Sequence, residues 1–551
     1  MPDDAFHKSA LAEFARAKAP EFIARFHRPK GRCFYPKIIC ETRSKKLALV
    51  ALLLAATCIQ LGCRQQWEPA GIVTVLIESS PTNLDPRIGV DAQSERIDSL
   101  IFDSLVRKDE HFNPTPWLAT SWETPDPLTW VFHLRNDVHF HDGRLLTSAD
   151  VKYTLDSILQ GKIVSVKANA YQTIDRVDAP DAQTLVVHLK KPDPALLWNL
   201  SDGGFGVVPA GSGRDFWKHP IGSGPYEFVS QEQDKDVVLR RAPHSWQPLP
   251  SIPTLRFAVV PDATTRALEL EKGSADATIN ALPADTVYAL RRDSNLQIDS
   301  GPGTTLVYLT FNTRDPVLRD PRVRNAIALA INRPLIIHSL YRDEARLAES
   351  ILPPEHWAWN GNVAQHNYDP AAANALLDEA GYPRKADGYR FHIGMKTSTD
   401  EGSRLLAMVV QQQLANVGIA LDVRSFEFAT FYADISRGVF QMAPSRWIGG
   451  NEAPDIFRYS FATASFPPHG ANRGFYANTR VDQLLSEAAS TSDRAKQQTA
   501  YDEVQSILAK DMPTINLWYL DTVLVHSRRL GNLHLSPSGN YDFLRGAILK
   551  E

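Results

Sequence analysis

Residues 127–159 read PLTWVFHLRNDVHFHDGRLLTSADVKYTLDSIL and predict two short strands followed by a helix. Trp130, Phe132 and Leu134 alternate with the residues between them, which is the period-two pattern of a half-buried strand. An Asp142-Gly143 turn follows the second alternating segment, because glycine tolerates a positive φ. Apolar residues then recur at helical spacing. The stretch therefore predicts the order strand, turn, strand, turn and helix.

The same stretch resembles a long motif of a known family. W-x-F-x-L-R-x-x-V-x-F-H-D-G-x-x-L-T-x-x-D-V, from Trp130 to Val151, is similar to the signature of the family 5 extracytoplasmic solute-binding proteins, the peptide, dipeptide and nickel receptors of ABC importers. A second segment, F-N-T followed by D-x-R-V-R-N-A-I-A-x-A-I-N-R between Phe311 and Arg333, resembles another motif of that family. The resemblance extends from about Ile72 to Asp542.

The resemblance implies a fold and a division into domains. It implies an α/β, two-lobed periplasmic-binding-protein fold of type II, cluster C-like, with an extra inserted subdomain and a ligand cleft between the lobes. A chain of 551 residues is long enough for two or three domains. We expect lobe I to comprise residues 63–105, 218–303 and 518–551, the inserted subdomain residues 106–217, and lobe II residues 304–517.

The charge distribution argues against a nucleic-acid partner. The formal net charge is −4, and residues 1–62 hold 11 Lys and Arg against 5 Asp and Glu. The remaining residues hold 48 against 58, a formal charge of −10. Proteins that bind nucleic acid carry basic patches, so the acidic balance disfavours that class.

Residues 43–62 predict a lipoprotein signal peptide. Basic residues precede an uncharged run of 16 residues, which is shorter than the ~20 residues of a membrane-spanning helix. A signal anchor that stays in the membrane is the alternative. The segment from Gln60 to Cys63 resembles a lipobox, although Gln60 stands where Leu is usual. Cys63 would then be lipidated and anchor an exported protein on the periplasmic side of a bacterial membrane.

The cysteine positions agree with export. All four cysteines, Cys33, Cys40, Cys58 and Cys63, lie at or before the predicted cleavage site, so the mature chain would contain no free thiol and no disulfide. Residues 1–42 precede the signal peptide and are interpreted as an N-terminal extension or as a start codon placed too early.

Two strand ends supply the first candidate ligand contacts. The strand at 72–77 opens into a loop with Ser79, Ser80 and Asn83, and ligands of α/β proteins bind at the carboxyl ends of strands. The resemblance also places this loop in the cleft, while a simple turn held by its prolines is the alternative. Phe311 and Asn312 end another predicted strand and are candidate contacts as well.

The segment 441–455, QMAPSRWIGGNEAPD, supplies the other candidates. Arg446 can bind a ligand carboxylate in a bidentate manner, or it can form a salt bridge across the cleft. Trp447 offers a flat apolar surface. Gly449 and Gly450 leave backbone groups bare, so that an extended ligand can approach the main chain.

The resemblance raises one discrepancy in this segment. In the peptide receptors a similar W-x-x-D-N-x-x-P-D loop supplies an Asp that pairs with the free amino terminus of the ligand, and the matching position here is Gly450, directly before the candidate contact Asn451. Glu452 could supply the missing charge, or it could be a solvated surface carboxylate. The missing Asp therefore argues against a ligand that is held by its amine alone.

No motif indicates an enzyme or a resident cofactor. G-x-S-x-G, H-E-x-x-H and P-loop patterns are absent from the sequence. His139 and His141, with His133 nearby, could bind a metal, but two histidines fall short of the usual four ligands, so we predict no metal site. An unrecognised hydrolase and a receptor for a metal chelate, sugar or opine-like solute are the alternatives.

The expected function is capture of a peptide or peptide-like solute by hinge closure. Closure would present a joint surface of both lobes to the permease subunits of an ABC transporter. We expect a monomer that acts without chemistry of its own. A role as a chaperone or as the ligand-presenting partner of a sensor is the third possibility.

Overall fold

The computed structural model describes residues 71–201, 203–491 and 493–550. The predicted N-terminal extension, the signal peptide 43–62 and the lipidation site Cys63 lie outside the described residues. Of the described helices, none has the length and apolar character needed to span a bilayer.

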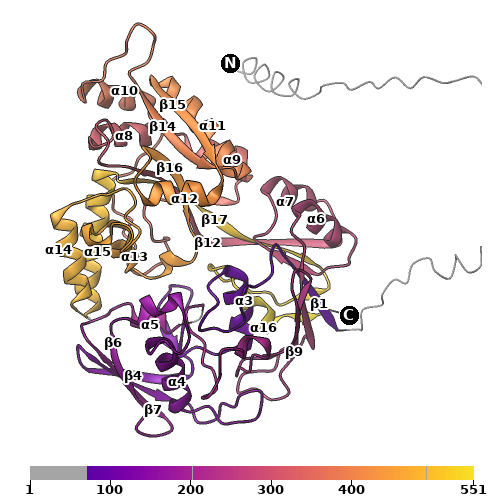
Figure 1. Cartoon of the computed structure of the whole chain (residues 1–551). Helices are drawn as coiled ribbons and strands as arrows, with labels where there is room; N and C mark the ends of the chain where they lie inside the picture. The colour runs from indigo at the N-terminus through magenta and orange to yellow at the C-terminus, as the bar shows by residue number, and fades with distance from the viewer. Residues whose placement is uncertain (1–70, 202, 492, 551) are drawn as a thin grey trace, which may run out of the picture. The chain divides into compact units, whose positions relative to one another are not determined.

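A mixed sheet of eleven strands runs through the described chain (Figure 1). The two lobes share it, which confirms the predicted two-lobed α/β fold. Its strands in spatial order are β15 (Ile419–Phe426), β14 (Phe391–Ser398), β16 (Met442–Trp447), β12 (Leu296–Phe311), β17 (Thr514–Ser527), β11 (Ala277–Ile279), β1 (Ile72–Ile77), β10 (Thr254–Val259), β9 (Asp236–Arg241) and β8 (Tyr226–Glu232), with β13 (Ala345–Leu347) paired to β17.

Two long antiparallel strands connect the lobes. β12 has 16 residues and β17 has 14, and in Figure 1 they run between the part with α10 and α11 and the part with β1 and β9. Their register shifts between Gly301 and Thr305 and again between Val307 and Tyr308. The names lobe I, inserted subdomain and lobe II denote the residue ranges expected from the sequence.

The inserted subdomain has its own sheet and core. Its four strands follow the order β4-β5-β7-β6, and α4 packs against them. Its elements are β2 (Val106–Lys108), β3 (Pro114–Pro116), β4 (Ala119–Asp126), β5 (Thr129–Leu134), α4 (Ser148–Leu159), the 3-10 helix η1 (Val166–Tyr171), β6 (Ile174–Asp178), β7 (Thr184–Leu189) and α5 (Leu196–Asn199).

The stretch 127–159 folds largely as predicted. β5 and α4 form its two ends, and the predicted second strand is reduced to a single bridge between His139 and Leu145. The backbone N–H and the hydroxyl of Thr147 both donate to the carboxylate of Asp150, at 2.9 and 3.0 Å. This capping box explains why the helix begins at Ser148.

The helices of the lobes cover the large sheet. Lobe I carries α3 (Ala92–Ile101), α6 (Ala263–Glu271), α7 (Ala284–Leu290), α16 (Phe543–Gly546) and the short pair β18 (Leu530–Gly531) and β19 (Ile548–Leu549), and the 3-10 helix η2 (Phe216–Lys218) lies at its boundary with the inserted subdomain. Lobe II carries α8 (Pro321–Ala330), α9 (Arg333–Tyr341), α10 (Pro370–Glu379), α11 (Glu401–Asn416), α12 (Phe428–Ser436), α13 (Ile456–Phe461), α14 (Thr479–Ala489), α15 (Arg494–Asp511) and the 3-10 helices η3 (Gly450–Glu452) and η4 (Thr463–Ser465).

The turn Gly222-Ser223-Gly224 fixes the end of α3. The backbone N–H of Gly224 donates to the carbonyl of Ile101 at 2.8 Å, and a Cβ on Gly222 would lie only 1.9 Å from that same oxygen. Glycine is therefore required at position 222 for the close approach of the two backbones. The turn therefore positions α3, which carries the acidic side chains Glu95 and Asp98.

Candidate ligand-binding site

One edge of β16 is open to an extended ligand. β16 pairs with β12 along its length but with β14 only through Met442 opposite Met395. Pro444 has no N–H, so its pair with Leu309 lacks the hydrogen bonds of the ladder. Two residues further on, the N–H and C=O of Arg446 point to the same open edge. Such an edge can bind another extended chain.

Arg446 and Trp447 face opposite sides of the sheet, because successive side chains of a strand alternate. The Trp447 ring stacks on Tyr308, with ring centroids 6.3 Å apart, and meets the edge of Tyr459 at 6.2 Å. The Arg446 side chain lies on the other face near Asp400, which caps α11. The two predicted contacts therefore belong to different walls of the site.

Arg446 retains its capacity to bind an anion. Its Nη2 lies 3.7 Å from the Asp400 carboxylate, and 40% of its side chain is exposed. Asp400 belongs to lobe II, so the predicted alternative of a salt bridge across the cleft is wrong for this neighbour. Among the described residues the guanidinium makes no hydrogen bond. Its planar donors can therefore bind a ligand carboxylate.

Arg473 is a cationic neighbour of Trp447 that the sequence alone did not single out. Its Nη2 donates to the Tyr432 hydroxyl at 2.7 Å, and its guanidinium carbon lies 4.9 Å from that ring and 6.0 Å from the Trp447 ring. Trp447, Arg473 and Tyr308 line a common pocket with Ser445. An aromatic and cationic wall of this kind suits planar or carboxylate groups.

Gly449 leaves the backbone open, whereas Asn451 faces inwards. Gly449 has a φ of +71°, and a Cβ added to it would have no atom within 4 Å, so the space beside it is open. Asn451 is buried, and its Nδ2 donates to the carbonyls of Thr304 and Ile351 at 2.8 and 3.1 Å. The side chain of Asn451 therefore connects backbone segments of lobe II.

Glu452 forms a buried contact between lobe II and the inserted subdomain. It is 5% exposed, and its Oε2 accepts a hydrogen bond from Lys108 Nζ at 2.6 Å. Thr304 Oγ1 lies 3.4 Å from the other carboxylate oxygen. The interpretation of Glu452 as a solvated surface carboxylate is wrong. The carboxylate does pair with an ammonium group, and that group belongs to the protein itself.

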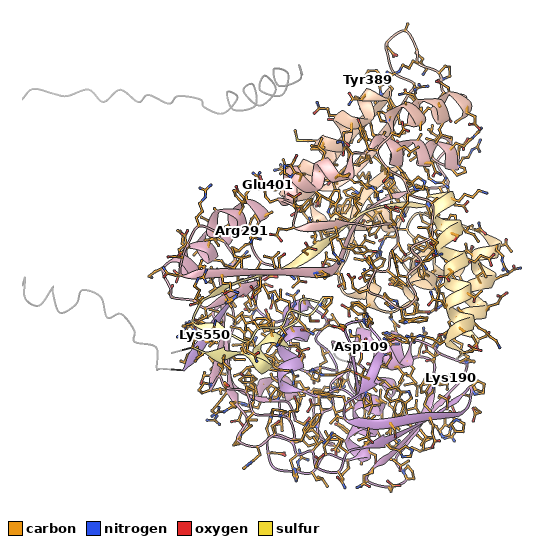
Figure 2. The ribbon with its side chains drawn as sticks, turned by 180° about the vertical axis from the view of Figure 1, so that it is seen from behind. Asp109, Lys190, Arg291, Tyr389, Glu401 and Lys550 are labelled. Carbon is orange, nitrogen blue, oxygen red and sulfur yellow. The ribbon has the colours of Figure 1, made fainter. Side chains whose placement is uncertain are left out.

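The hairpin of β2 and β3 carries Lys108 to this contact. Asp109, labelled in Figure 2, begins the turn of the hairpin. The ring of Phe112 in the same turn stacks on His356 of lobe II, with centroids 5.8 Å apart. Arg494 of lobe II donates to Asn113. The hairpin turn therefore docks on lobe II at several points.

His356 completes this contact as a neutral ring. Burial lowers the pKa of His356 to about 3. Its Nδ1 accepts the N–H of Ala358 at 3.0 Å, so the proton is on Nε2, which donates to the Glu452 carbonyl at 3.2 Å. The ring supports the backbone of the segment that carries Glu452.

The predicted loop after β1 lies between α3 and the β8–β9 hairpin. Ser80 Oγ accepts the N–H of Asp234 at 2.8 Å, and Ser79 is exposed. The Asn83 N–H donates to Ser94 of α3 at 3.2 Å. Ser79 remains accessible to a ligand, whereas Ser80 and Asn83 shape the loop.

Phe311 and Asn312 contribute to the fold of lobe II. Phe311 is fully buried in the core between the sheet and the helices α8 and α11. The side-chain amide of Asn312 donates to the carbonyls of Gly438 and Phe440, each at 3.0 Å. In this structure neither side chain is presented to a ligand.

His141 is used within the protein. Its Nδ1 accepts the N–H of Gly222 at 3.2 Å, so the proton is on Nε2, which donates to the carbonyl of Gly224 at 2.9 Å. Burial lowers the pKa of His141. In the described part of the chain, no group of three or more His, Cys, Asp or Glu side chains could hold a metal ion.

The chain is similar in sequence to several known proteins. The model of the bacterial extracellular solute-binding proteins, family 5 (middle), matches residues 113–466. The glutathione-binding protein GsiB of Escherichia coli K12 is 28% identical over 484 residues, which cover 86% of this chain and 93% of that protein. GsiB of Pectobacterium atrosepticum is 29% identical over 483 residues, which cover 85% and 92%.

Solved structures share the fold. NikA of Brucella suis, crystallised with Fe(III)-EDTA, has a TM-score of 0.79 at 23% identity, and the match covers 87% of this chain and all of NikA. AppA of Bacillus subtilis, crystallised with a nonapeptide, has a TM-score of 0.71 at 24% identity, with 87% and 99% covered.

Proposed function

Because the chain belongs to family 5 of the bacterial extracellular solute-binding proteins, the receptors of ABC importers, we propose that its solute is a peptide or a peptide-like molecule. The solute binds between the lobes and is delivered to the permease subunits. The open edge of β16 is the observation that carries this proposal, since it offers main-chain hydrogen bonds to an extended ligand.

The relatives support the same class of ligand. GsiB is named for glutathione, a peptide-like molecule, and the AppA structure contains a nonapeptide. The site has complementary groups, with Arg446 available for a carboxylate and the Trp447 ring for an apolar side chain. Main-chain pairing gives affinity, and the side-chain pockets give specificity.

Capture proceeds by closure of the lobes about the crossing strands. β12 and β17 are the elements that can bend, and the contact of Lys108 with Glu452 forms when the hairpin turn meets lobe II. A ligand that contacts both lobes binds the closed state more tightly and shifts the population towards it. The protein performs no bond-breaking step in this mechanism.

The proposal also includes a lipid anchor and a monomeric receptor. Family members act outside the cytoplasm, and lipidation at Cys63 would hold this chain at the membrane beside its permease. The receptor acts as a monomer. Lipidation predicts a mass increase on the peptide that begins at Cys63, and globomycin, which blocks cleavage of lipoprotein signal peptides, should leave the signal peptide attached to the chain.

Native mass spectrometry of the chain, purified without refolding, tests the class of ligand. Denaturation of the complex should release a heterogeneous set of peptides, because main-chain recognition is tolerant of side chains. Release of a single non-peptide mass or of a metal chelate would contradict the proposal and favour the alternative class of receptor. Hydrolysis of the released peptides by the purified chain would indicate an enzyme instead.

Arg446→Ala is expected to weaken binding of a carboxylate-bearing peptide by about 2 kcal/mol, since a charge-assisted bidentate pair is lost. Isothermal titration calorimetry with a peptide recovered from the native complex measures the change. Arg424→Ala, an exposed substitution on the edge strand β15, which pairs with β14, is the control and should leave the affinity unchanged. Equal affinities of the Arg446 variant and the parent would reject this role.

A further inference from the structure

A second pocket lies in lobe I, against the helix α3, where it meets the inserted subdomain. It is lined by side chains from α3, β2, η1 and the loops before and after them. The residues that matter to its chemistry are Pro86, Glu95, Asp98, Arg107 and Lys167.

Asp98 is the unusual member of this pocket. It is 5% exposed, and within the described residues neither of its carboxylate oxygens has a hydrogen-bond partner. A carboxylate in such a place loses its hydration without compensation, which is costly for folding. The described residues supply no hydrogen-bond donor to Asp98, so a ligand that donates hydrogen bonds would compensate this cost.

The other charges of the pocket are already matched. Glu95, one turn before Asp98 on the same face of α3, lies 3.7 Å from Lys167 Nζ. Lys167 also donates to the Pro86 carbonyl at 3.0 Å. Arg107 lies 3.3 Å from the Asp542 carboxylate, and its guanidinium carbon is 4.1 Å from the Trp117 ring. Asp98 remains the acceptor without a donor.

Burial sets the protonation of the two acidic groups. It raises the pKa of Glu95 to about 7 and the pKa of Asp98 well above its usual range. Lys167 lowers the pKa of Asp98, whereas the carboxylates of Asp85, Glu95 and Asp91 raise it. Burial therefore favours the protonated form of Asp98 more than it would for an exposed carboxyl group.

The pocket adjoins the boundary between the lobes. Lys108, which reaches Glu452 of lobe II, also acts electrostatically on Glu95 and follows Arg107 in β2. Arg107 lines the pocket, and the next residue of β2 contacts lobe II, so the pocket lies one residue away from this contact between the lobes. In lobe II the alternative acidic anchor, Glu452, is occupied by Lys108.

We propose that Asp98, with Glu95 beside it, binds the ammonium group of the ligand. This assignment rests on the proposed function, because it takes the ligand to be a peptide or a peptide-like molecule with a free amine. An ammonium group donates hydrogen bonds to both Asp98 oxygens and compensates the charge of the ionised carboxylate. The positive charge lowers the pKa of Asp98, so that binding favours release of a proton from this carboxyl group to solvent.

An ammonium group fits the pocket better than a metal ion. The two carboxylates have no third Asp, Glu, His or Cys within the described residues with which to complete a metal site. A divalent cation would need more oxygen ligands than these side chains offer. An amine needs only the acceptors that are present.

Calorimetry with two tripeptide libraries tests the assignment on the full chain. One library has free amino termini, and the other has the same sequences with acetylated amino termini. We expect the free-amine library to bind at least tenfold more tightly. Titrations at pH 6 in buffers of different ionisation enthalpy should show proton release with the free-amine library alone.

Asp98→Asn is the decisive variant. It should weaken binding of the free-amine library at least tenfold, reduce the proton release and leave the acetylated library unaffected. Glu110→Gln, on the exposed turn of the β2–β3 hairpin, is the matched control and should behave as the parent. Circular dichroism verifies that the variant folds. If it does not fold, the comparison of the two libraries and the proton release, both measured on the parent protein, test the ammonium site.

The outcomes separate this assignment from the proposed function. Equal binding of both libraries to the parent, or full affinity of Asp98→Asn for free amines, would overturn the ammonium site and leave peptide capture intact. Failure of both libraries to bind the parent would contradict peptide capture itself, and the ammonium site with it.

Discussion

Lys108→Met is expected to lower the free energy of unfolding by about 3 kcal/mol, because it leaves Glu452 buried without its cation. Lys108 Nζ and Glu452 Oε2 are 2.6 Å apart, and both side chains are largely buried. Methionine preserves most of the length of the side chain, so the lost packing is small. Urea denaturation of the parent and the variant at pH 7 measures the change.

A double-mutant cycle isolates the pair. Glu452→Gln keeps an acceptor for Thr304 and removes the charge, so Lys108→Met combined with Glu452→Gln should recover most of the lost stability. If the double variant is as unstable as Lys108→Met alone, the loss does not come from an unpaired carboxylate. Exposed Lys190→Met in the inserted subdomain, labelled in Figure 2, serves as the control and should change stability little.

The same pair links stability to ligand capture. Lys108 belongs to the inserted subdomain and Glu452 to lobe II, so the contact favours the closed arrangement of the lobes. Loss of the contact should increase the open population before ligand is added. Small-angle scattering of Lys108→Met without ligand should then give a larger radius of gyration than that of the parent, and ligand should remove the difference.

Much of the fold could be predicted from local sequence. The alternation from Trp130 to Leu134, the cap at Thr147 and the β-α-β order of lobe II act over a few residues, and the structure contains each of them. The predicted length of the second strand in the stretch 127–159 was wrong. His139 and Leu145 form only one bridge, because the tight turn leaves too few residues for a longer ladder.

The site was harder to predict because it depends on distant partners. Glu452 and Lys108 are 344 residues apart, and no local pattern distinguishes a buried paired carboxylate from a solvated one. The opposite orientation of Arg446 and Trp447, in contrast, follows from strand alternation and was predictable. Asn312, at the end of a predicted strand, and Asn451, in the segment 441–455, were candidate ligand contacts, yet their side-chain amides donate to backbone carbonyls of the protein.

Asp98 shows a further limit of sequence reasoning. Its spacing from Glu95 places both on one face of a helix, which a sequence can predict. Whether that face is buried or exposed to solvent depends on segments such as η1 and the loop at Pro86, which lie against α3 only in the folded chain. The raised pKa of Asp98 is a consequence of that packing and leaves no trace in the local sequence.

Arg324→Met is expected to lower the free energy of unfolding by about 4 kcal/mol, more than any other substitution discussed. Arg324 belongs to the motif D-x-R-V-R-N-A-I and is 3% exposed. Its guanidinium donates to the carbonyls of Leu318 and Arg319, at 2.7 and 2.9 Å, and its Nε donates to the carbonyl of Met512 at 2.8 Å. Methionine fills the space but leaves these buried carbonyls without donors.

The position of those carbonyls explains why a cation is needed. Met512 follows the last turn of α15, where the helix leaves carbonyls without intrahelical partners and its dipole is negative. Arg324 therefore joins the start of α8 to the end of α15. Arg324→Lys should restore only part of the stability, since a single ammonium group cannot reach the carbonyls at both ends of this contact.

Urea denaturation of matched variants of α8 measures this contribution. Arg322→Met removes an arginine from the same helix, but that side chain is 44% exposed and pairs with Asp320 at the surface, so its loss should cost less than about 1 kcal/mol. Equal losses for Arg322→Met and Arg324→Met would show that the buried hydrogen bonds of Arg324 contribute nothing specific. A loss several times larger for Arg324→Met would establish that this motif residue acts in folding, at a distance from the ligand.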